Sequence, residues 1–196
     1  MNRIRVSGIV AQEPEFSHTT FGEDFYKFYL MSVRTSGVND IIPCIVPESL
    51  EKYVECGSDI DIVGEVRTRN VDGHMEIQVF VLDVNAHESN IDYNYVEIEG
   101  YVCKKPVLRE TPLGRVITDI IIASNRERVH KSDYIPCIVW GRNAQRASEY
   151  EVGTKLNIVG RLQSREYTKR ISDTETETRT AYEVSISKLE AVTDEG

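Results

Sequence analysis

The sequence predicts an all-β protein made of two tandem five-stranded barrels, each with one short helix between strands three and four. Three observations predict this fold class. The chain repeats itself at an interval of 92 residues or slightly more, each copy alternates Val, Ile and Tyr with polar residues over short segments, and each copy contains one helix-like segment. The interval is too long for a solenoid unit and suits a small domain with its own core.

The repeat shows in landmarks whose spacing grows along the chain. Four residues recur 92 positions later: Gly8, Pro14, Gly22 and Arg34 return as Gly100, Pro106, Gly114 and Arg126. The run 42–46 (IPCIV) recurs 93 later, and Gly57 and Val63-Gly64 recur 96 later. Glu76 and Leu82 match Glu183 and Leu189 at an interval of 107. We therefore expect 11 extra residues (107 minus 96) in the second copy, in a long charged loop at 168–180.

The expected elements follow one order in both copies. In the second copy the strands are 94–104, 115–124, 133–141, 154–166 and 181–191, with a helix at 143–150; its counterpart, 48–55, follows Pro47. Gly8 and Gly100 interrupt good strand patterns, which indicates a bend or a close backbone approach. Asp72-Gly73 predicts a hairpin turn. Five strands with a bent first strand describe the OB-fold, although periodicity alone leaves other small barrels open.

The sequence also indicates the domain boundary, the cellular location and whether a metal is expected. Segment 87–92 has no apolar period, so we place the domains at 1–88 and 93–196. No stretch approaches the roughly 18 apolar residues of a membrane helix, and no targeting segment is visible, so we expect a cytoplasmic protein. Cys44 and Cys137 fall on equivalent strands and are interpreted as buried hydrophobes. The four cysteines include no close pair of the kind that zinc sites use, and the four histidines fall at non-equivalent places in turns or linkers, so we expect no metal and no cofactor.

Charge is distributed unevenly over a chain whose formal net charge is −9. Residues 1–90 hold 7 Lys and Arg against 15 Asp and Glu, giving −8, whereas residues 91–196 hold 16 against 17, giving −1. A binding groove needs only a local cluster of charge, and the second half is where a basic cluster is expected.

One face of the second copy combines aromatic and basic residues. Alternation places Tyr134 and Trp140 on the open face of strand three. On strand four the same face carries Arg161, Gln163, Arg165, Tyr167 and Lys169. Arg142 on the next turn and Arg126 are two further cations that we expect to contact the nucleic acid. Rings among guanidinium groups suit single-stranded nucleic acid, whose bases stack and whose phosphates pair. Taken singly, Trp140 is more typical of a core plug and the arginines of a solvated face. The first copy has Ile41, Pro47, Glu65 and Val71 at the corresponding positions.

The run 134–144 (YIPCIVWGRNA), Tyr150, Gly153 and the run 158–167 (IVGRLQSREY) resemble the bacterial single-stranded DNA-binding protein family. The resemblance implies an OB-fold, sequence-tolerant binding of single-stranded DNA in replication, repair and recombination, and bodies of four OB domains, hence a homodimer of this chain. It places the stacking aromatics at Tyr134, Trp140 and Tyr167.

The resemblance has one departure. Family members usually continue into a tail with an acidic tip that recruits replication proteins, whereas this sequence ends at Glu195-Gly196. An alternative is therefore a primosomal accessory factor that acts mainly through protein contacts. A third hypothesis, an enzyme or tRNA-related OB module, finds no phosphate loop, activated nucleophile or carboxylate cluster to support it, so we expect no catalysis.

Overall fold

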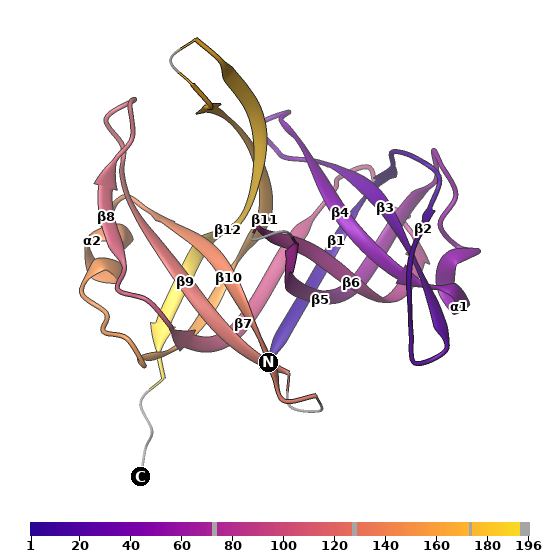
Figure 1. Cartoon of the computed structure of the whole chain (residues 1–196), viewed down its shortest axis with the longest axis horizontal. Coiled ribbons are helices and arrows are strands. Elements are labelled where there is room, and N and C mark those ends of the chain that lie inside the picture. The colour runs from indigo at the N-terminus through magenta and orange to yellow at the C-terminus, as the bar shows by residue number, and fades with distance from the viewer. Residues whose placement is uncertain (72–73, 127–128, 173, 193–196) are drawn as a thin grey trace.

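The computed structural model describes residues 1–71, 74–126, 129–172 and 174–192. Over these residues the chain forms twelve strands and two short helices, and all the strands belong to one continuous sheet. The sheet curls into two barrels that stand side by side, with α1 and α2 at opposite outer ends of the molecule (Figure 1). None of the helices formed by the described residues is long and apolar enough to cross a membrane.

The first barrel is a closed ring of five strands. Its members are β1 (Asn2–Val10), β3 (Glu23–Val33), β4 (Asn39–Pro47), β5 (Asp59–Val71) and β6 (His74–Ala86). β1 pairs with both β3 and β5, and a short parallel pairing of β4 with β6 closes the ring. Helix α1 (Glu48–Glu51) follows β4 and is shorter than predicted. The predicted turn residues Asp72 and Gly73 lie outside the described residues.

The second barrel repeats this ring. Its members are β7 (Asn94–Val102), β9 (Val116–Arg126), β10 (Lys131–Trp140), β11 (Lys155–Arg170) and β12 (Thr176–Ala191), with helix α2 (Arg142–Ser148) between β10 and β11. The prediction of two five-stranded barrels is confirmed. The two strand glycines permit close backbone approach, since a Cβ at Gly8 would lie 2.2 Å from the Met31 oxygen and one at Gly100 would lie 2.5 Å from the Ala123 oxygen.

Each barrel carries one short strand that the sequence did not predict. β2 (Glu15–Thr20) forms a hairpin with β3, and β8 (Val107–Glu110) forms a hairpin with β9. Every residue of β8 is exposed, so its side chains have no core face to pack against. A strand of this kind leaves no apolar alternation in the sequence, which is why periodicity missed both.

The long loop expected at 168–180 is wrong. β11 and β12 remain paired as far as Arg170 and Thr176, and they form a hairpin that rises beyond the second barrel (Figure 1). Its residues are charged or Thr-rich and mostly exposed, which resembles loop composition. Threonine nevertheless favours strands, and here both faces of the hairpin are solvated.

Strand register also corrects the alignment of the two copies. Ile62 pairs with Val84, and Ile158 pairs with Leu189. Because Ile62 and Ile158 are equivalent, Leu189 corresponds to Val84, at an interval of 105, and the match of Leu82 with Leu189 is wrong. Burial agrees, since Leu82 is exposed and Leu189 is buried. The second copy therefore has 9 extra residues (105 minus 96), not 11.

The barrels are joined by antiparallel pairing of β1 with β7. The register is centred on Ile4 and Val96, which are equivalent residues of the two copies, so the barrels are related by a local two-fold axis. β6 ends at Ala86 and β7 begins at Asn94, and the segment between them belongs to no strand.

Candidate nucleic-acid interface

Trp140 ends β10 beside the first of two grooves. Its ring N–H donates to the hydroxyl of Ser185 on β12, at 3.1 Å. Ser185 in turn pairs with Arg161 across β11 and β12, which brings the arginine next to the ring. We call the adjoining hollow, about 390 Å³, the tryptophan groove; it is lined by Arg34, Arg115, Trp140, Arg161, Gln163, Ser164, Arg165 and Ser185.

The structure separates the two interpretations of Trp140. A core plug would be buried, whereas 37 % of the surface of Trp140 is exposed. The hydrogen bond to Ser185 fixes one edge of the ring and leaves part of the residue open to solvent. Such a ring can accept a stacked base.

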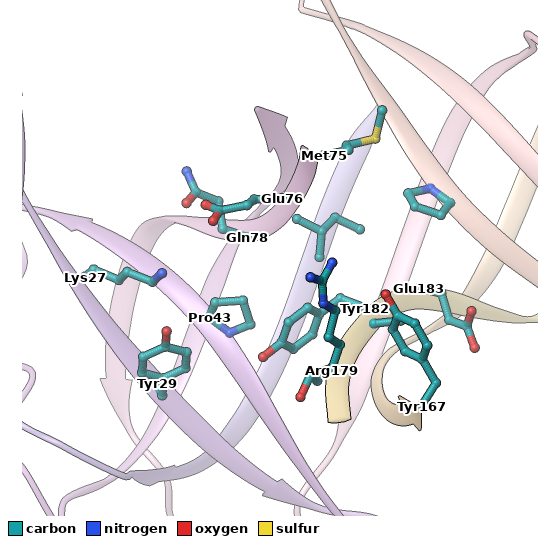
Figure 2. A pocket seen from close by; sticks show the side chains of 14 residues that line it. Lys27, Tyr29, Pro43, Met75, Glu76, Gln78, Tyr167, Arg179, Tyr182 and Glu183 are labelled. Atoms are coloured by element: carbon teal, nitrogen blue, oxygen red, sulfur yellow. The ribbon is translucent and has the colours of Figure 1, made fainter. Parts of the chain in front are cut away.

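The second groove lies between the two barrels. The hairpin of β11 and β12 forms one wall with Tyr167, Arg179 and Tyr182, and the first barrel forms the other with Lys27 and Tyr29 (Figure 2). We call this hollow, about 480 Å³, the interdomain groove. Its remaining lining includes Pro43, Met75, Glu76, Gln78, Pro136 and Glu183.

Glu183 connects the two grooves and moderates their charge. It is nearly buried and accepts hydrogen bonds from Gln163 at 3.1 Å and from Arg165 at 3.4 Å. Gln163 was expected on the open face, but it is buried, because Glu183 satisfies its amide from the next strand. Arg165 remains half exposed beside this carboxylate.

The other predicted residues are dispersed. Tyr134 is exposed, and its backbone N–H donates to Thr68 of the first barrel at 3.0 Å, but it lines neither groove. Arg142 on α2 and Lys169 on the hairpin are exposed and also stand apart from both grooves. Arg126 forms a salt bridge with buried Asp133, and the hydrogen bond that its guanidinium donates to the Asp133 carboxylate is the main cause that raises the pKa of Arg126.

Sequence reasoning missed an aromatic and basic patch on the first barrel. The Cζ of Arg67 lies 3.4 Å from the ring centroid of Phe80, and Phe80 contacts Phe25, which stacks on His18. Burial lowers the pKa of Arg67. This first-domain patch borders a hollow of about 910 Å³ whose lining also includes Phe21, Arg69, Arg126 and Lys131.

Phe80, an aromatic residue of this patch, does not align with any aromatic residue of the second-domain site. Phe80 pairs with Glu65, as Ser185 pairs with Arg161, so Phe80 occupies the position of Ser185 rather than that of Trp140. A position-by-position comparison with the second copy finds only the loss of Trp140, Tyr134 and Tyr167. The gain lies on the neighbouring strand, which only the register reveals.

Comparison with known proteins identifies the family. The model of the single-strand binding protein family matches residues 93–192, just over half of the chain. The chain belongs to this family. The family is non-enzymatic. The single-stranded DNA-binding protein of Enterococcus faecalis is 34 % identical to this chain over 80 residues. Single-stranded DNA-binding protein B of Bacillus subtilis is 31 % identical over 81 residues.

The extent of these matches differs from one relative to the next. Each covers 38 % of this chain, together with 43 % of the Enterococcus protein and 72 % of the Bacillus protein. The chain spans about half the length of most of the curated relatives it matches. Among solved structures, wild-type single-stranded DNA binding protein from Thermus aquaticus is 21 % identical, with a TM-score of 0.78 over 100 % of this chain and 95 % of that one. This likeness supports the tandem OB-fold.

Proposed function

We propose that the chain binds single-stranded DNA without sequence preference and that the second domain holds the strand. The observation that carries the proposal is the exposed ring of Trp140 in a groove that also presents Arg115, Arg161 and Arg165. Base stacking on an aromatic ring contributes about 1–3 kcal/mol per base, and it is sequence-tolerant because every base has a π-face. The guanidinium groups pair with phosphates and release counterions.

The interdomain groove extends this site. Tyr167 on its wall is a second stacking position, and Lys169 lies two residues further along the same strand, on the same side of β11. Tyr134 and Arg142 are proposed as outer contacts that a longer strand would reach. Membership of the family supports a role in DNA replication, repair and recombination.

Fluorescence titration with oligo-dT tests the proposal directly. Trp140 is the only tryptophan in the sequence, so one probe reports on one site. Stacking of a base on the ring should quench its emission in proportion to bound DNA. Saturating oligo-dT that leaves the spectrum unchanged, while an independent assay detects binding, would remove Trp140 from the site. A chain that binds no oligo-dT in either assay would contradict the proposed function.

We further propose that two chains associate to give a body of four OB domains. Light scattering should then report about twice the chain mass of 22.3 kDa. Alternation along β4 predicts an apolar contact surface around Ile41, Ile45 and Pro47, but this prediction is wrong for Ile45, which is buried within the single chain. A strictly monomeric chain at micromolar concentration would contradict the assembly without affecting DNA binding.

The division of labour between domains 1–88 and 93–196 is also a proposal. The first domain has Ile41, Pro47 and Val71 where the second has aromatic residues, and its formal charge is strongly negative. We therefore propose that it mainly supports assembly. The first-domain patch around Phe80 is the structural feature that would make it a second DNA contact, and it is tested separately below.

A further inference from the structure

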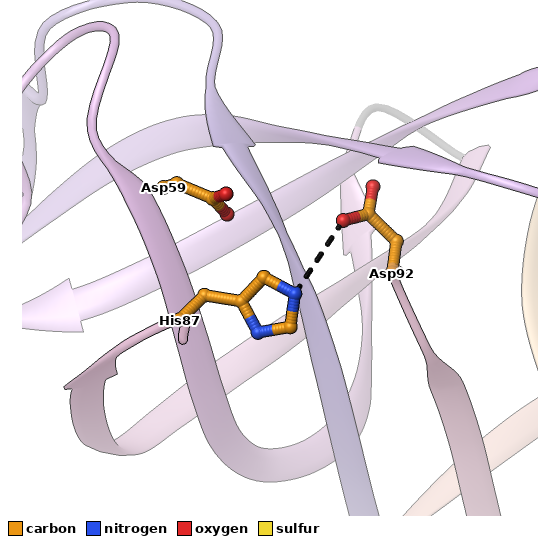
Figure 3. Close-up of side chains that lie close together, drawn as sticks. All are labelled: Asp59, His87 and Asp92. Carbon is orange, nitrogen blue, oxygen red and sulfur yellow. Dashed lines mark ion pairs between the residues drawn. The ribbon is translucent and has the colours of Figure 1, made fainter. Parts of the chain in front are cut away.

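Three side chains gather where the first barrel passes into the second. Asp59 begins β5, His87 follows the last residue of β6, and Asp92 lies two residues before β7. One ligand atom from each lies within 4.8 Å of the other two. Figure 3 shows the imidazole of His87 between the two carboxylates, with its Nε2 directed toward Asp92.

His87 is the unusual member of this cluster. Its side chain is only 3 % exposed, and among the described residues its Nε2 has no hydrogen-bond partner. Asp92 Oδ1 lies 3.8 Å from this nitrogen, which is too long for a hydrogen bond. Buried polar atoms are almost always satisfied, so an orphan nitrogen that faces a carboxylate points to something bound between them.

The surrounding contacts hold His87 and Asp92 in place. The backbone N–H of His87 donates to the Asp59 carbonyl at 3.2 Å, and the ring packs edge-on against Tyr93 at 5.7 Å. The second oxygen of Asp92, Oδ2, accepts from the N–H of Val33 at 2.7 Å, which leaves Oδ1 for His87. The exposed side chain of Asp59 can rotate toward the other two.

We propose that Asp59, His87 and Asp92 bind one zinc ion, with water in the fourth position. One imidazole nitrogen and two carboxylate oxygens form a donor set that zinc accepts, and bond lengths of about 2.0–2.2 Å place tetrahedral ligand atoms about 3.4 Å apart. The separation of 3.8 Å between His87 Nε2 and Asp92 Oδ1 needs only a small contraction. Calcium and magnesium prefer oxygen-only sites, which disfavours them here.

The ion would fix the linker. His87 and Asp92 bracket the segment between the barrels, and Asp59 anchors it to β5. The sequence analysis expected no metal because the cysteines form no close pair and the histidines occupy non-equivalent places in the two copies. Asp59 is 28 residues from His87 in the sequence (87 minus 59). The two residues are close because β5 and β6 are antiparallel, so that the start of β5 lies beside the end of β6.

Calorimetric titration of the metal-free full chain with zinc chloride tests the proposal. All proteins carry Cys56→Ser and Cys103→Ser, which removes the two thiols that are not buried. We expect one zinc per chain, and at least tenfold weaker binding in His87→Ala and in Asp59→Asn. His130→Asn, which changes an exposed histidine, is the matched control and should bind as the parent does. The melting temperature should rise with zinc in the parent and not in His87→Ala.

Two results would overturn the proposal. Equal zinc binding by His87→Ala and the parent would place the ion elsewhere. No zinc binding by the parent would show that the cluster holds no zinc. Asp59→Asn alters an exposed side chain, so its result does not depend on the fold, and oligo-dT binding by each variant confirms that the barrels are intact.

Discussion

Asp40 and Asp133 occupy equivalent positions in the two barrels, and each carboxylate accepts a hydrogen bond from the backbone of the opposite barrel. Asp40 binds the N–H of Ser164 at 2.8 Å, and Asp133 binds the N–H of Thr68 at 2.6 Å. Each also forms a salt bridge with an arginine of its own barrel, Arg34 or Arg126. The two barrels are therefore locked by reciprocal polar contacts as well as by β1 and β7.

Asp133→Asn should destabilise the chain strongly. Asp133 is fully buried, so the substitution removes the counter-charge of Arg126, whose side chain is 23 % exposed. Breaking a fully buried pair costs about 3–5 kcal/mol, and the partial exposure of Arg126 places this loss at the lower end of that range. Chemical denaturation measures the loss. Asp119→Asn, in an exposed pair with Arg109, is the matched control and should cost about 1 kcal/mol or less. Equal losses in both variants would show that the polar contacts of Asp133 contribute little to the free energy of unfolding.

Salt should weaken oligo-dT binding with a defined slope. If Arg142, Arg161, Arg165 and Lys169 each contact a phosphate, the logarithm of affinity should fall against the logarithm of salt concentration with a slope of about −3, from about −0.7 per contact. Arg161→Ala should reduce that slope by about 0.7. Binding that does not respond to salt would remove the phosphate contacts and leave stacking alone.

The aromatic residues of the second domain should dominate binding. Trp140→Ala with Tyr167→Ala should lose roughly 2–6 kcal/mol of binding free energy if each ring stacks one base. Tyr53→Ala, at an exposed tyrosine near α1, is the control and should bind normally. Phe80→Ala tests the first-domain patch while keeping the buried side chain of Phe25, and the proposed division of labour predicts a smaller loss there. A larger loss there than in the Trp140 and Tyr167 double variant would assign the strand to the first domain.

The cysteines provide a probe of each domain. Burial raises the pKa of Cys44 and of Cys137 far above the usual thiol range, so both stay protonated and unreactive at pH 8. Exposed Cys56 should react rapidly with a thiol reagent, and Cys103 more slowly, because burial raises its pKa as well. Denaturant should then release Cys44 when the first barrel opens and Cys137 when the second opens. Rapid labelling of all four in the native chain would contradict the buried interpretation.

Sequence patterns predicted the barrels because their cores obey a simple alternation. Ile135, Cys137 and Val139 are all buried, as the period required. The same period failed at Ile138, which alternation places on the open side with Trp140 but which is buried. The prediction of a loop at 168–180 was wrong for a different reason. Neither face of the hairpin beyond Tyr167 meets a core, so its sequence carries no apolar alternation that would indicate strands.

The candidate site was predictable only in part for a related reason. Alternation grouped Trp140 with Arg161 and Arg165 correctly on one groove. It treated β10 and β11 as neighbouring strands, however, and β12 lies between them. Arg34 and Arg115 reach the tryptophan groove from a different barrel and a different hairpin, so no local spacing connects them to it. Arg126 was expected to be free for phosphate, but its partner Asp133 lies on the neighbouring strand and is found only from the register.

The pairing of β1 with β7 has a consequence for strand direction. In an assembly of identical subunits about a two-fold axis, every feature occurs on both sides, so a DNA strand crossing the axis meets the same surface from either end. Here the axis relates unlike barrels, with Trp140 on one side and Pro47 on the other. A strand that crosses both barrels would therefore encounter them in a fixed order, and its 5′ and 3′ ends would not be interchangeable.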